Sequence, residues 1–299
     1  MFFLQFIVDA LEKIKTSLQE EEAEPLLEGL NSLSLECNKN ENNRKFAASK
    51  DALNLLYNSC NHGYLLKDNN VLGASLDALS SLLSGQGELV NSNMIEFLAN
   101  SLKELKEDIL FGKIVKAVRI ACVKSESNRQ TFVANGVIPC LVSALMEYKK
   151  SSEIIVEICS ALRVFTFDDD MSVAFGKAHE HAKLIVTENA LSIILNIMET
   201  CEDIDVASEL CVTLSRLAVR NEYCKDIVDL GGLKMVLKLL QEHTSNQVCI
   251  ITGNRNVIRV LQLFTDTGRI LHPDEILLFL SCQEYQLCIK EFVSKNSGN

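Results

Sequence analysis

Apolar residues recur along this chain at helical intervals, and the helical pattern itself recurs over a longer interval. Behind Gly136, apolar side chains stand two, five and nine places further on, at Ile138, Leu141 and Leu145. These positions share one face of a helix, and Pro139 stands in its first turn, where proline is tolerated. A glycine followed directly by such a helix predicts a tight corner between two helices.

The same spacing occurs five more times, always behind a residue type that tolerates left-handed backbone. The six anchor residues are separated by 42, 42, 43, 53 and 42 positions. A repeat of this length buries its apolar faces only by stacking on its neighbours, so the fold is predicted to be an all-α solenoid. The anchors are Asp9, Asp51, Asn93, Gly136, Asn189 and Gly231.

Two stretches carry a more specific pattern. One runs from Ala161 to Lys183 and begins ALRVFTFDDD, and the other is ELCVTLSRLAVRNEYCKDIVDLGG, from Glu209 to Gly232. With the helix corner at Gly136, they make the chain resemble an animal branch of the armadillo-repeat family over roughly residues 1–240. The resemblance implies a right-handed superhelix that acts as a protein-interaction scaffold, with no established catalytic activity.

The resemblance also sets expected boundaries. Family members extend further at both ends, so residues 1–250 are expected to form an armadillo array that starts inside a repeat. Residues 251–299 are expected to be a divergent last repeat or tail of the same solenoid, because Thr252-Gly253-Asn254 interrupts its third helix. A further anchor at Asp274 is incomplete, since Gln283 takes the place of its third apolar residue.

Arginine recurs near the end of the third helix, the helix that lines the concave groove of an armadillo stack according to the resemblance. Four successive repeats have it, at spacings of 44, 53 and 43 residues. A guanidinium presents a rigid fork of donors that suits carboxylates, phosphates and backbone carbonyls. The predicted partner-binding residues are Arg119, Arg163, Arg216 and Arg259.

Two interpretations of these arginines compete. In the first, each one pairs with an acidic residue of the next repeat and ties the stack together. In the second, they bind a segment of a partner protein with acidic or phosphorylated side chains. Import-adaptor armadillo proteins clamp basic peptides with paired Trp and Asn. That mechanism is not expected here, because the chain has no Trp and has Arg in the place of that Asn.

The spacing of 53 residues indicates an insertion of eleven residues at about 165–181. The insertion could be a structural loop, a protein-contact loop or a metal site, because it combines phenylalanines, an acidic run and histidines. His-x-His is not the i, i+4 spacing of a helical zinc pair, so a metal-dependent hydrolase built on Asp168–Asp170, His179 and His181 is the less favoured alternative. The candidate contact residues are Phe167, Asp168, Asp169, Asp170, Phe175, His179 and His181.

Composition agrees with a helical, protein-binding chain. Of the 299 residues, 47% are hydrophobic, but only 6% are aromatic and three are proline. Scarce Pro and Gly disfavour a β-sandwich, and the high apolar content excludes a disordered chain. A formal net charge of −11 makes nucleic acid an unexpected partner, because phosphate neutralisation dominates such binding.

The chain is expected in the cytosol, the nucleus or both. Its eleven cysteines form no CxxC pair and sit in apolar patterns, which favours buried thiols over zinc sites or disulfides. The apolar start has no basic segment before it, and no run reaches the roughly 18 apolar residues of a membrane span, so neither a secretory signal nor a membrane partner is expected.

The sequence therefore predicts a non-catalytic scaffold or adaptor for other proteins. It contains no GxSxG, HExxH or phosphate-binding glycine loop, so no catalytic residue, metal or cofactor is assigned. A structural subunit that uses its convex face and end repeats is the alternative non-catalytic role.

Overall fold

A computed structural model describes residues 2–218, 220–232 and 234–236, and the regular elements in these ranges are helices. The chain divides into two compact units, residues 1–181 and 182–299, which are described separately. None of the helices in the described ranges is both long and apolar enough to cross a membrane.

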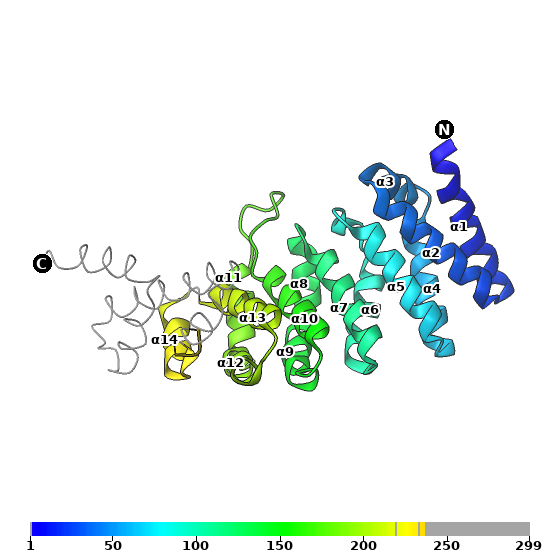
Figure 1. The fold of residues 1–299 in the computed structure, drawn as a ribbon. Helices are drawn as coiled ribbons and strands as arrows, with labels where there is room; N and C mark the ends of the chain where they lie inside the picture. The colour runs from blue at the N-terminus through cyan, green and yellow to red at the C-terminus, as the bar shows by residue number, and fades with distance from the viewer. Residues whose placement is uncertain (1, 219, 233, 237–299) are drawn as a thin grey trace, which may run out of the picture. The chain divides into compact units, whose positions relative to one another are not determined.

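In the first unit, the helices follow one another in chain order as repeats of a short first helix and two longer ones (Figure 1). The first helices are α3 (Glu41–Ser49), the 3₁₀ helix η1 (Gly87–Leu89) and α8 (Glu126–Ala134). The second helices are α1 (Phe2–Glu20), α4 (Ala52–Leu66), α6 (Ser92–Glu104) and α9 (Val137–Glu147). The third helices are α2 (Ala23–Lys39), α5 (Asn69–Leu83), α7 (Asp108–Cys122) and α10 (Ser152–Phe165).

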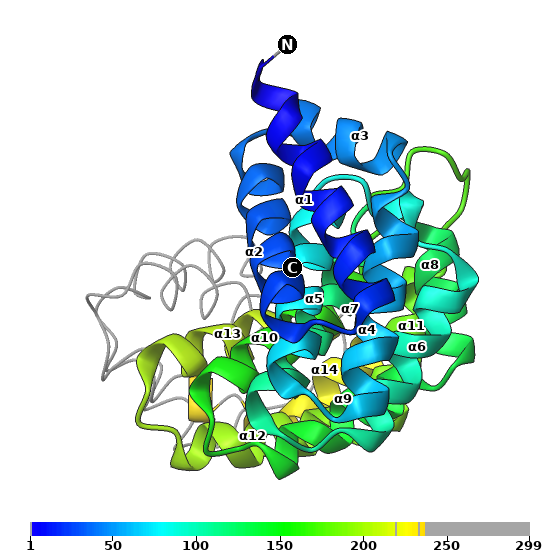
Figure 2. The same cartoon turned by 90° about the vertical axis from the view of Figure 1, so that its right-hand side faces the viewer.

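The third helices of the first unit pack on one another in succession, α2 on α5, α5 on α7 and α7 on α10 (Figure 2). On α5, α7 and α10, more than half of the residues are buried and the remaining residues form a stripe that faces solvent. On α7, for example, Ile114 and Val118 are fully buried, whereas Lys116 is exposed. The charged side chains of α5, α7 and α10 therefore lie on the part of each helix that is not buried.

Four of the six predicted anchors have the left-handed backbone expected of a corner. In the first unit φ is 64° at Asp51 and 75° at Gly136, and in the second unit it is 67° at Asn189 and 81° at Gly231. The first three of these residues directly precede the second helix of their repeat. At these four corners, the residue type and the repeat period both predicted the left-handed backbone that the structure has.

The anchors at Asp9 and Asn93 were wrong as corners. Asp9 lies in the middle of the continuous helix α1, where its carboxylate accepts a hydrogen bond from Gln5 Nε2 at 2.8 Å. Asn93 lies in the first turn of α6, and Asn91 is the N-cap that accepts the backbone N–H of Met94 at 3.0 Å. The apolar spacing still marks a buried helix face at both places, but no left-handed residue starts the helix.

The repeat that lacks a left-handed corner at Asn93 also has the shortest first helix, η1. The backbone of η1 lies directly against the end of α7, because a Cβ on Gly87 would stand 2.7 Å from the carbonyl oxygen of Ala121. Asn128 bridges the two segments, since its Nδ2 donates to the Gly87 carbonyl and to the Ala121 carbonyl, each at 2.8 Å. This close approach requires glycine at position 87. In this repeat, the single 3₁₀ turn of η1 stands where the other repeats have a full first helix.

The second unit continues the same repeat. The helix α11 (Ala178–Thr187) reaches into it and is followed by α12 (Ala190–Thr200), α13 (Ile204–Leu217) and α14 (Asn221–Asp229). α12 packs against α13 and α14, and its predicted core residues Leu191, Ile194 and Met198 are buried as expected. Arg259, Asp274 and the predicted boundary near residue 250 lie outside the described residues.

Candidate protein-interaction surfaces

Three of the four predicted arginines lie in the last turn of a third helix. Arg119 lies in the last turn of α7 and Arg163 in that of α10 in the first unit, and Arg216 lies in the last turn of α13 in the second. A cation in the last turn interacts favourably with the helix dipole. Within each unit these arginines therefore occupy the helix positions that the repeat period predicts. The helix dipole favours a cation there even when no partner is bound.

Arg119 connects two successive repeats. Its Nε donates to a carboxylate oxygen of Glu157 on α10, the next third helix. One repeat earlier, Lys113 Nζ on α7 donates to Asp77 Oδ2 on α5 at 2.6 Å. At Arg119 the structure thus shows the first interpretation, in which the arginine pairs with an acidic residue of the next repeat.

The other two arginines have different surroundings. Arg163 is half-buried, and its Nη2 donates to Ser160 Oγ of the same helix at 3.0 Å. Arg216 is exposed on α13. In the first unit, we use the name third-helix surface for five charged side chains on the solvent-facing stripes of α7 and α10, namely Lys113, Lys116, Arg119, Glu157 and Arg163.

The insertion is shorter than the predicted 165–181. The helix α10 continues through Phe165 and α11 begins at Ala178, so the connecting loop spans 166–177. His179 and His181 belong to α11 and not to the loop. Figure 1 shows the loop, in light green, extending beyond the neighbouring helices α8 and α10.

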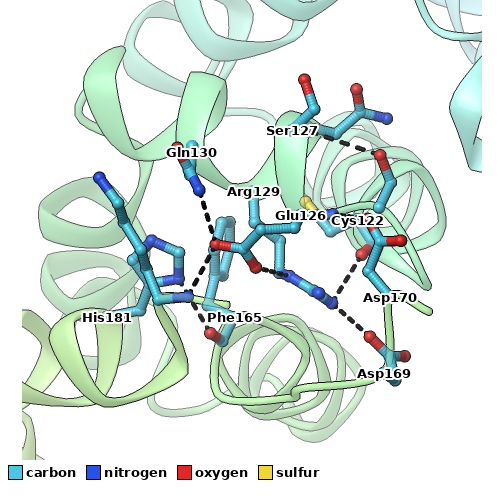
Figure 3. A network of polar contacts seen from close by, with 12 residues as sticks. Cys122, Glu126, Ser127, Arg129, Gln130, Phe165, Asp169, Asp170 and His181 are labelled. Carbon is cyan, nitrogen blue, oxygen red and sulfur yellow. Dashed lines mark hydrogen bonds and ion pairs between the residues drawn. The ribbon is translucent and has the colours of Figure 1, made fainter. Parts of the chain in front are cut away.

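The root of the loop is held by a buried arginine, Arg129 of α8 (Figure 3). Its Nε donates to Glu126 Oε2 at 3.0 Å, and its Nη1 donates to Asp169 Oδ1 at 2.6 Å and to the Cys122 carbonyl at 3.2 Å. The Arg129 and Glu126 side chains are 0% and 1% exposed. We call Glu126, Arg129, Asp169 and Asp170 the Arg129 cluster.

The buried charges of the cluster are compensated by hydrogen bonds. Glu126 Oε1 accepts from Gln130 Nε2 at 3.0 Å and from the backbone N–H of Lys177 at 2.9 Å. Burial acts to raise the pKa of Glu126, but these bonds and the one from Arg129 outweigh it and hold the pKa below its ordinary value. For Arg129, burial acts to lower the pKa, and the bonds to Asp169 and Glu126 outweigh it and raise the pKa. Both groups therefore remain charged in the interior.

The acidic run of the loop joins it to the start of α8. Asp170 Oδ2 accepts the backbone N–H of Glu126 at 2.8 Å, and its Oδ1 accepts the hydroxyl and N–H of Ser172 at 2.6 and 2.9 Å. The bond from the Ser172 hydroxyl, followed by those from the backbone N–H groups of Glu126 and Ser172, lowers the pKa of Asp170. Carboxylates are stabilised at a helix N-terminus, so Asp169 and Asp170 have a structural role here.

The tip of the loop displays apolar side chains to solvent. Met171 is 97% exposed and Phe175 is 92% exposed, and Val173 between them is also exposed. Phe167 is half-buried and Asp168 is exposed. Among the predicted loop contacts, Phe175 therefore has the geometry of a contact residue, on a segment fixed by the Arg129 cluster.

His181 forms a buried bond that recurs in the first unit. Its Nδ1 lies 3.1 Å from the Phe165 carbonyl near the end of the preceding third helix. Asn43 and Asn128 donate through Nδ2 to the corresponding carbonyls of their repeats at 2.9 and 2.8 Å. Burial lowers the pKa of His181, partly offset by this bond, so the neutral ring takes the place of an asparagine.

The metal-site hypothesis is not supported by this arrangement. Asp169 and Asp170 bind α8, the buried ring of His181 faces a backbone carbonyl, and His179 is exposed on α11. Within the described ranges, no group of three or more His, Cys, Asp or Glu side chains could hold a metal ion.

Sequence reasoning missed Arg129, although a signal was present. An Asn-Arg pair occurs at 43–44 and again at 128–129, two repeats later, and each arginine follows a cysteine by seven residues. In both cases Nη1 of the arginine donates to the carbonyl of that cysteine, Cys37 at 3.1 Å and Cys122 at 3.2 Å. A comparison of the polar positions of the repeats, and not only the apolar ones, would have found the pair.

The stack of three-helix repeats is the armadillo architecture. The designed armadillo repeat protein YIII(Dq)4CqI matches with a TM-score of 0.70 and 14% identity, over 84% of this chain and 99% of that one. A related design, YIII(Dq.V1)4CPAF, solved in complex with the peptide (KR)4, matches with a TM-score of 0.67 and 17% identity, over 87% and 100%. Identities this low show the fold alone, and the protein is accordingly an all-α armadillo solenoid.

Sequence comparison narrows the class to one family. The family model ARMC6 matches residues 4–269. Armadillo repeat-containing protein 6 of Homo sapiens is 35% identical over 276 residues, which cover 91% of this chain and 54% of the human protein. The homologue of Drosophila melanogaster is 28% identical over 262 residues, covering 86% and 55%. The chain belongs to the armadillo repeat-containing protein 6 family, and it spans about half the length of the curated relatives it matches.

Proposed function

We propose that this chain is a non-catalytic scaffold that binds a partner protein along its third-helix surface. The observation that carries the proposal is the row of cations on one exposed stripe of α7, formed by Lys113, Lys116 and Arg119. Arg163 adds a further cation on α10, the helix packed against α7. Extended solenoid surfaces suit a peptide or helix of a partner. The peptide held by the designed neighbour supports the use of this fold for such binding.

The chemistry of the surface favours a partner segment with acidic or phosphorylated side chains. Arg119 uses Nε for Glu157, its side chain is 28% exposed, and a guanidinium has two further nitrogens that can donate. Arginine pairs with carboxylates and phosphates through parallel hydrogen bonds. Arg119 can therefore connect the repeats and bind the partner. In the second unit, Arg216 and the predicted Arg259 would extend the same recognition.

The proposed location is the cytosol or the nucleus. Every cysteine that the structure describes is a free thiol, and most of them are buried. Disulfides are rare in these reducing compartments. The net charge of −11 also favours protein over nucleic acid as the partner.

Site-specific crosslinking tests the proposal. A photoreactive amino acid at Lys116 is expected to capture the partner in cells, whereas the same group at the exposed Lys45 on α3 is not. The double variant R119A/R163A should abolish the crosslink from position 116 with a melting temperature close to that of the wild type. Equal capture from both positions, or capture that survives the double variant, would contradict the proposal.

A second candidate role is a structural subunit that uses surfaces away from the third helices. The exposed Met171 and Phe175 at the loop tip favour it. Crosslinks from Ser172 in the loop, with none from Lys116, would support this role over the scaffold.

A further inference from the structure

A cavity of about 390 Å³ lies between α4 and α6, on the second helices of the first unit and away from the third-helix surface. Its size is near the lower end of the range of about 300–1,000 Å³ that ligand pockets show. It can therefore hold one long side chain or a similarly small group. Nothing in the proposed scaffold function uses it.

Three aromatic rings line this cavity. Tyr57 and Tyr64 come from α4, and Phe97, which is buried, comes from α6. The Phe97 ring is nearly perpendicular to both tyrosine rings, at 81° and 82°, with centroid separations of 6.3 and 5.9 Å. Rings that are nearly perpendicular to one another around one cavity can offer π surface to a bound group from more than one side.

The charged groups of the cavity have one sign. Glu96 and Glu104 of α6 are exposed at its lining, and among the described residues no Lys, Arg or His lines it. The Tyr64 hydroxyl donates to Glu104 Oε2, and this bond raises the pKa of the phenol. The phenol therefore stays neutral, and the carboxylate keeps a second oxygen for a ligand. Aromatic faces together with carboxylates attract a cation.

We infer that the cavity between α4 and α6 binds a cationic side chain, a lysine or an arginine, on a partner protein. The aliphatic stem of such a side chain would contact apolar surface at the rim, where Leu65 is 76% exposed. The ammonium or guanidinium group would lie against the rings, with Glu96 and Glu104 as counter-ions. Electrostatic complementarity selects this occupant over an acidic or neutral segment.

Titration of short peptides tests the inference. Acetylated, amidated peptides with a central lysine, trimethyllysine, arginine or norleucine between glycines are added to the ¹⁵N-labelled chain. The cationic peptides are expected to shift backbone amide signals of α4 and α6, with dissociation constants on the order of 1 mM. Norleucine, which keeps the aliphatic stem without the charge, is expected to leave them unchanged. The ranking of the three cations shows whether methylation improves the fit.

Variants identify the groups responsible. E96K/E104K should weaken binding by about tenfold or more, and Tyr57→Leu by about threefold, because one ring is lost. Glu88→Lys, an exposed charge reversal on η1 outside the cavity, is the matched control and should leave binding unchanged. The dispersion of the amide signals reports whether each variant is folded.

Four results would overturn the inference. They are norleucine binding as tightly as lysine, binding that survives E96K/E104K, shifts confined to the third helices, and no shift at millimolar peptide. Self-association that is lost in E96K/E104K would assign the cavity to a second copy of the chain and would equally refute a partner protein. These outcomes are independent of the crosslinking at Lys116.

Discussion

The first unit contains two sets of ion pairs with similar chemistry and different surroundings. On the third helices, the side chains of the Arg119–Glu157 and Lys113–Asp77 pairs are between 22% and 43% exposed. In the Arg129 cluster, the Arg129 side chain is fully buried. An exposed pair contributes about 0–1 kcal/mol because water and salt screen it. Loss of one member of a buried pair costs about 3–5 kcal/mol, because the other charge stays unpaired in the interior.

This difference separates two roles of arginine in one solenoid. A weak exposed pair can exchange its carboxylate for that of a partner at little cost, which suits the third-helix surface for binding. The buried Arg129–Glu126 pair cannot exchange partners in this way, and it fixes the root of the loop from which Met171 and Phe175 are exposed. Substitutions in the two regions should therefore differ in their effects on stability.

The largest effect is expected for Arg129→Met, which keeps the volume of the side chain but leaves Glu126 unpaired. The free energy of unfolding should fall by about 3–5 kcal/mol. Urea denaturation followed by circular dichroism measures it. A loss below about 1 kcal/mol would show that the buried cluster is no stronger than the exposed pairs.

Asp169→Asn should have an intermediate effect. The substitution removes the carboxylate that Arg129 Nη1 contacts but leaves Glu126 in place. The free energy of unfolding should fall by about 1.5–3 kcal/mol, the value of one hydrogen bond to a charged group. Hydrogen exchange of the amides in residues 166–177 should become faster. The exposed neighbour substitution Asp168→Asn is the control and should change neither quantity. Equal effects of the two substitutions would mean that the loop is not held through Asp169.

A smaller, pH-dependent effect is expected at His181. Its pKa is lowered in the folded chain, so the unfolded chain takes up the proton first as the pH falls through about 6.5. Stability should be constant above that pH and decrease below it. His181→Asn, which places there the residue type found at the equivalent Asn43 and Asn128, should remove this decrease, whereas His179→Asn should not.

A second acid-induced loss should remain in His181→Asn below about pH 4. The pKa values of Glu126 and Asp170 are below their ordinary values, and such carboxylates lose their stabilising effect only when the pH falls through the folded-state pKa. Melting temperatures across the two pH ranges separate these contributions. An unchanged profile in His181→Asn would show that His181 does not titrate on unfolding.

The smallest effect on stability is expected at Arg119. A double-mutant cycle of Arg119→Ala and Glu157→Ala should give a coupling energy of about 0.5 kcal/mol, and salt should reduce it. Binding of the partner should still be lost in Arg119→Ala. A coupling above about 2 kcal/mol would place this pair with the buried cluster and against a binding role.

Much of the fold could be predicted because the repeat leaves its period in the apolar residues. The second helix behind Asn189 and the buried positions Leu191, Ile194 and Met198 follow from spacing alone. The corner at Asn93 was predicted wrongly because the pattern of a buried helix face does not report how the chain enters the helix. Just before this helix, Gly87 packs against the end of α7, a contact between residues distant in sequence that the local pattern does not report.

The candidate site was predicted only in part. The sequence placed Arg119, Arg163 and Arg216 at equivalent positions of their helices, since register is a local property. It could not decide whether an arginine ties two repeats or binds a partner, because that depends on which carboxylate lies on the neighbouring helix. Glu157 is 38 residues from Arg119 along the chain and reaches it only after stacking.

By itself, the sequence determined the helical class, the repeat of about 42 residues and the place of the insertion, because apolar periodicity encodes which faces must be buried. Only the tertiary structure decided what the polar residues do. It made Asp169 and Asp170 a connection to α8 instead of a metal site, and it brought the aromatic rings of α4 and the carboxylates of α6 around one cavity. The physical reason is that burial and pairing of polar groups depend on neighbours from other repeats, which no local pattern specifies.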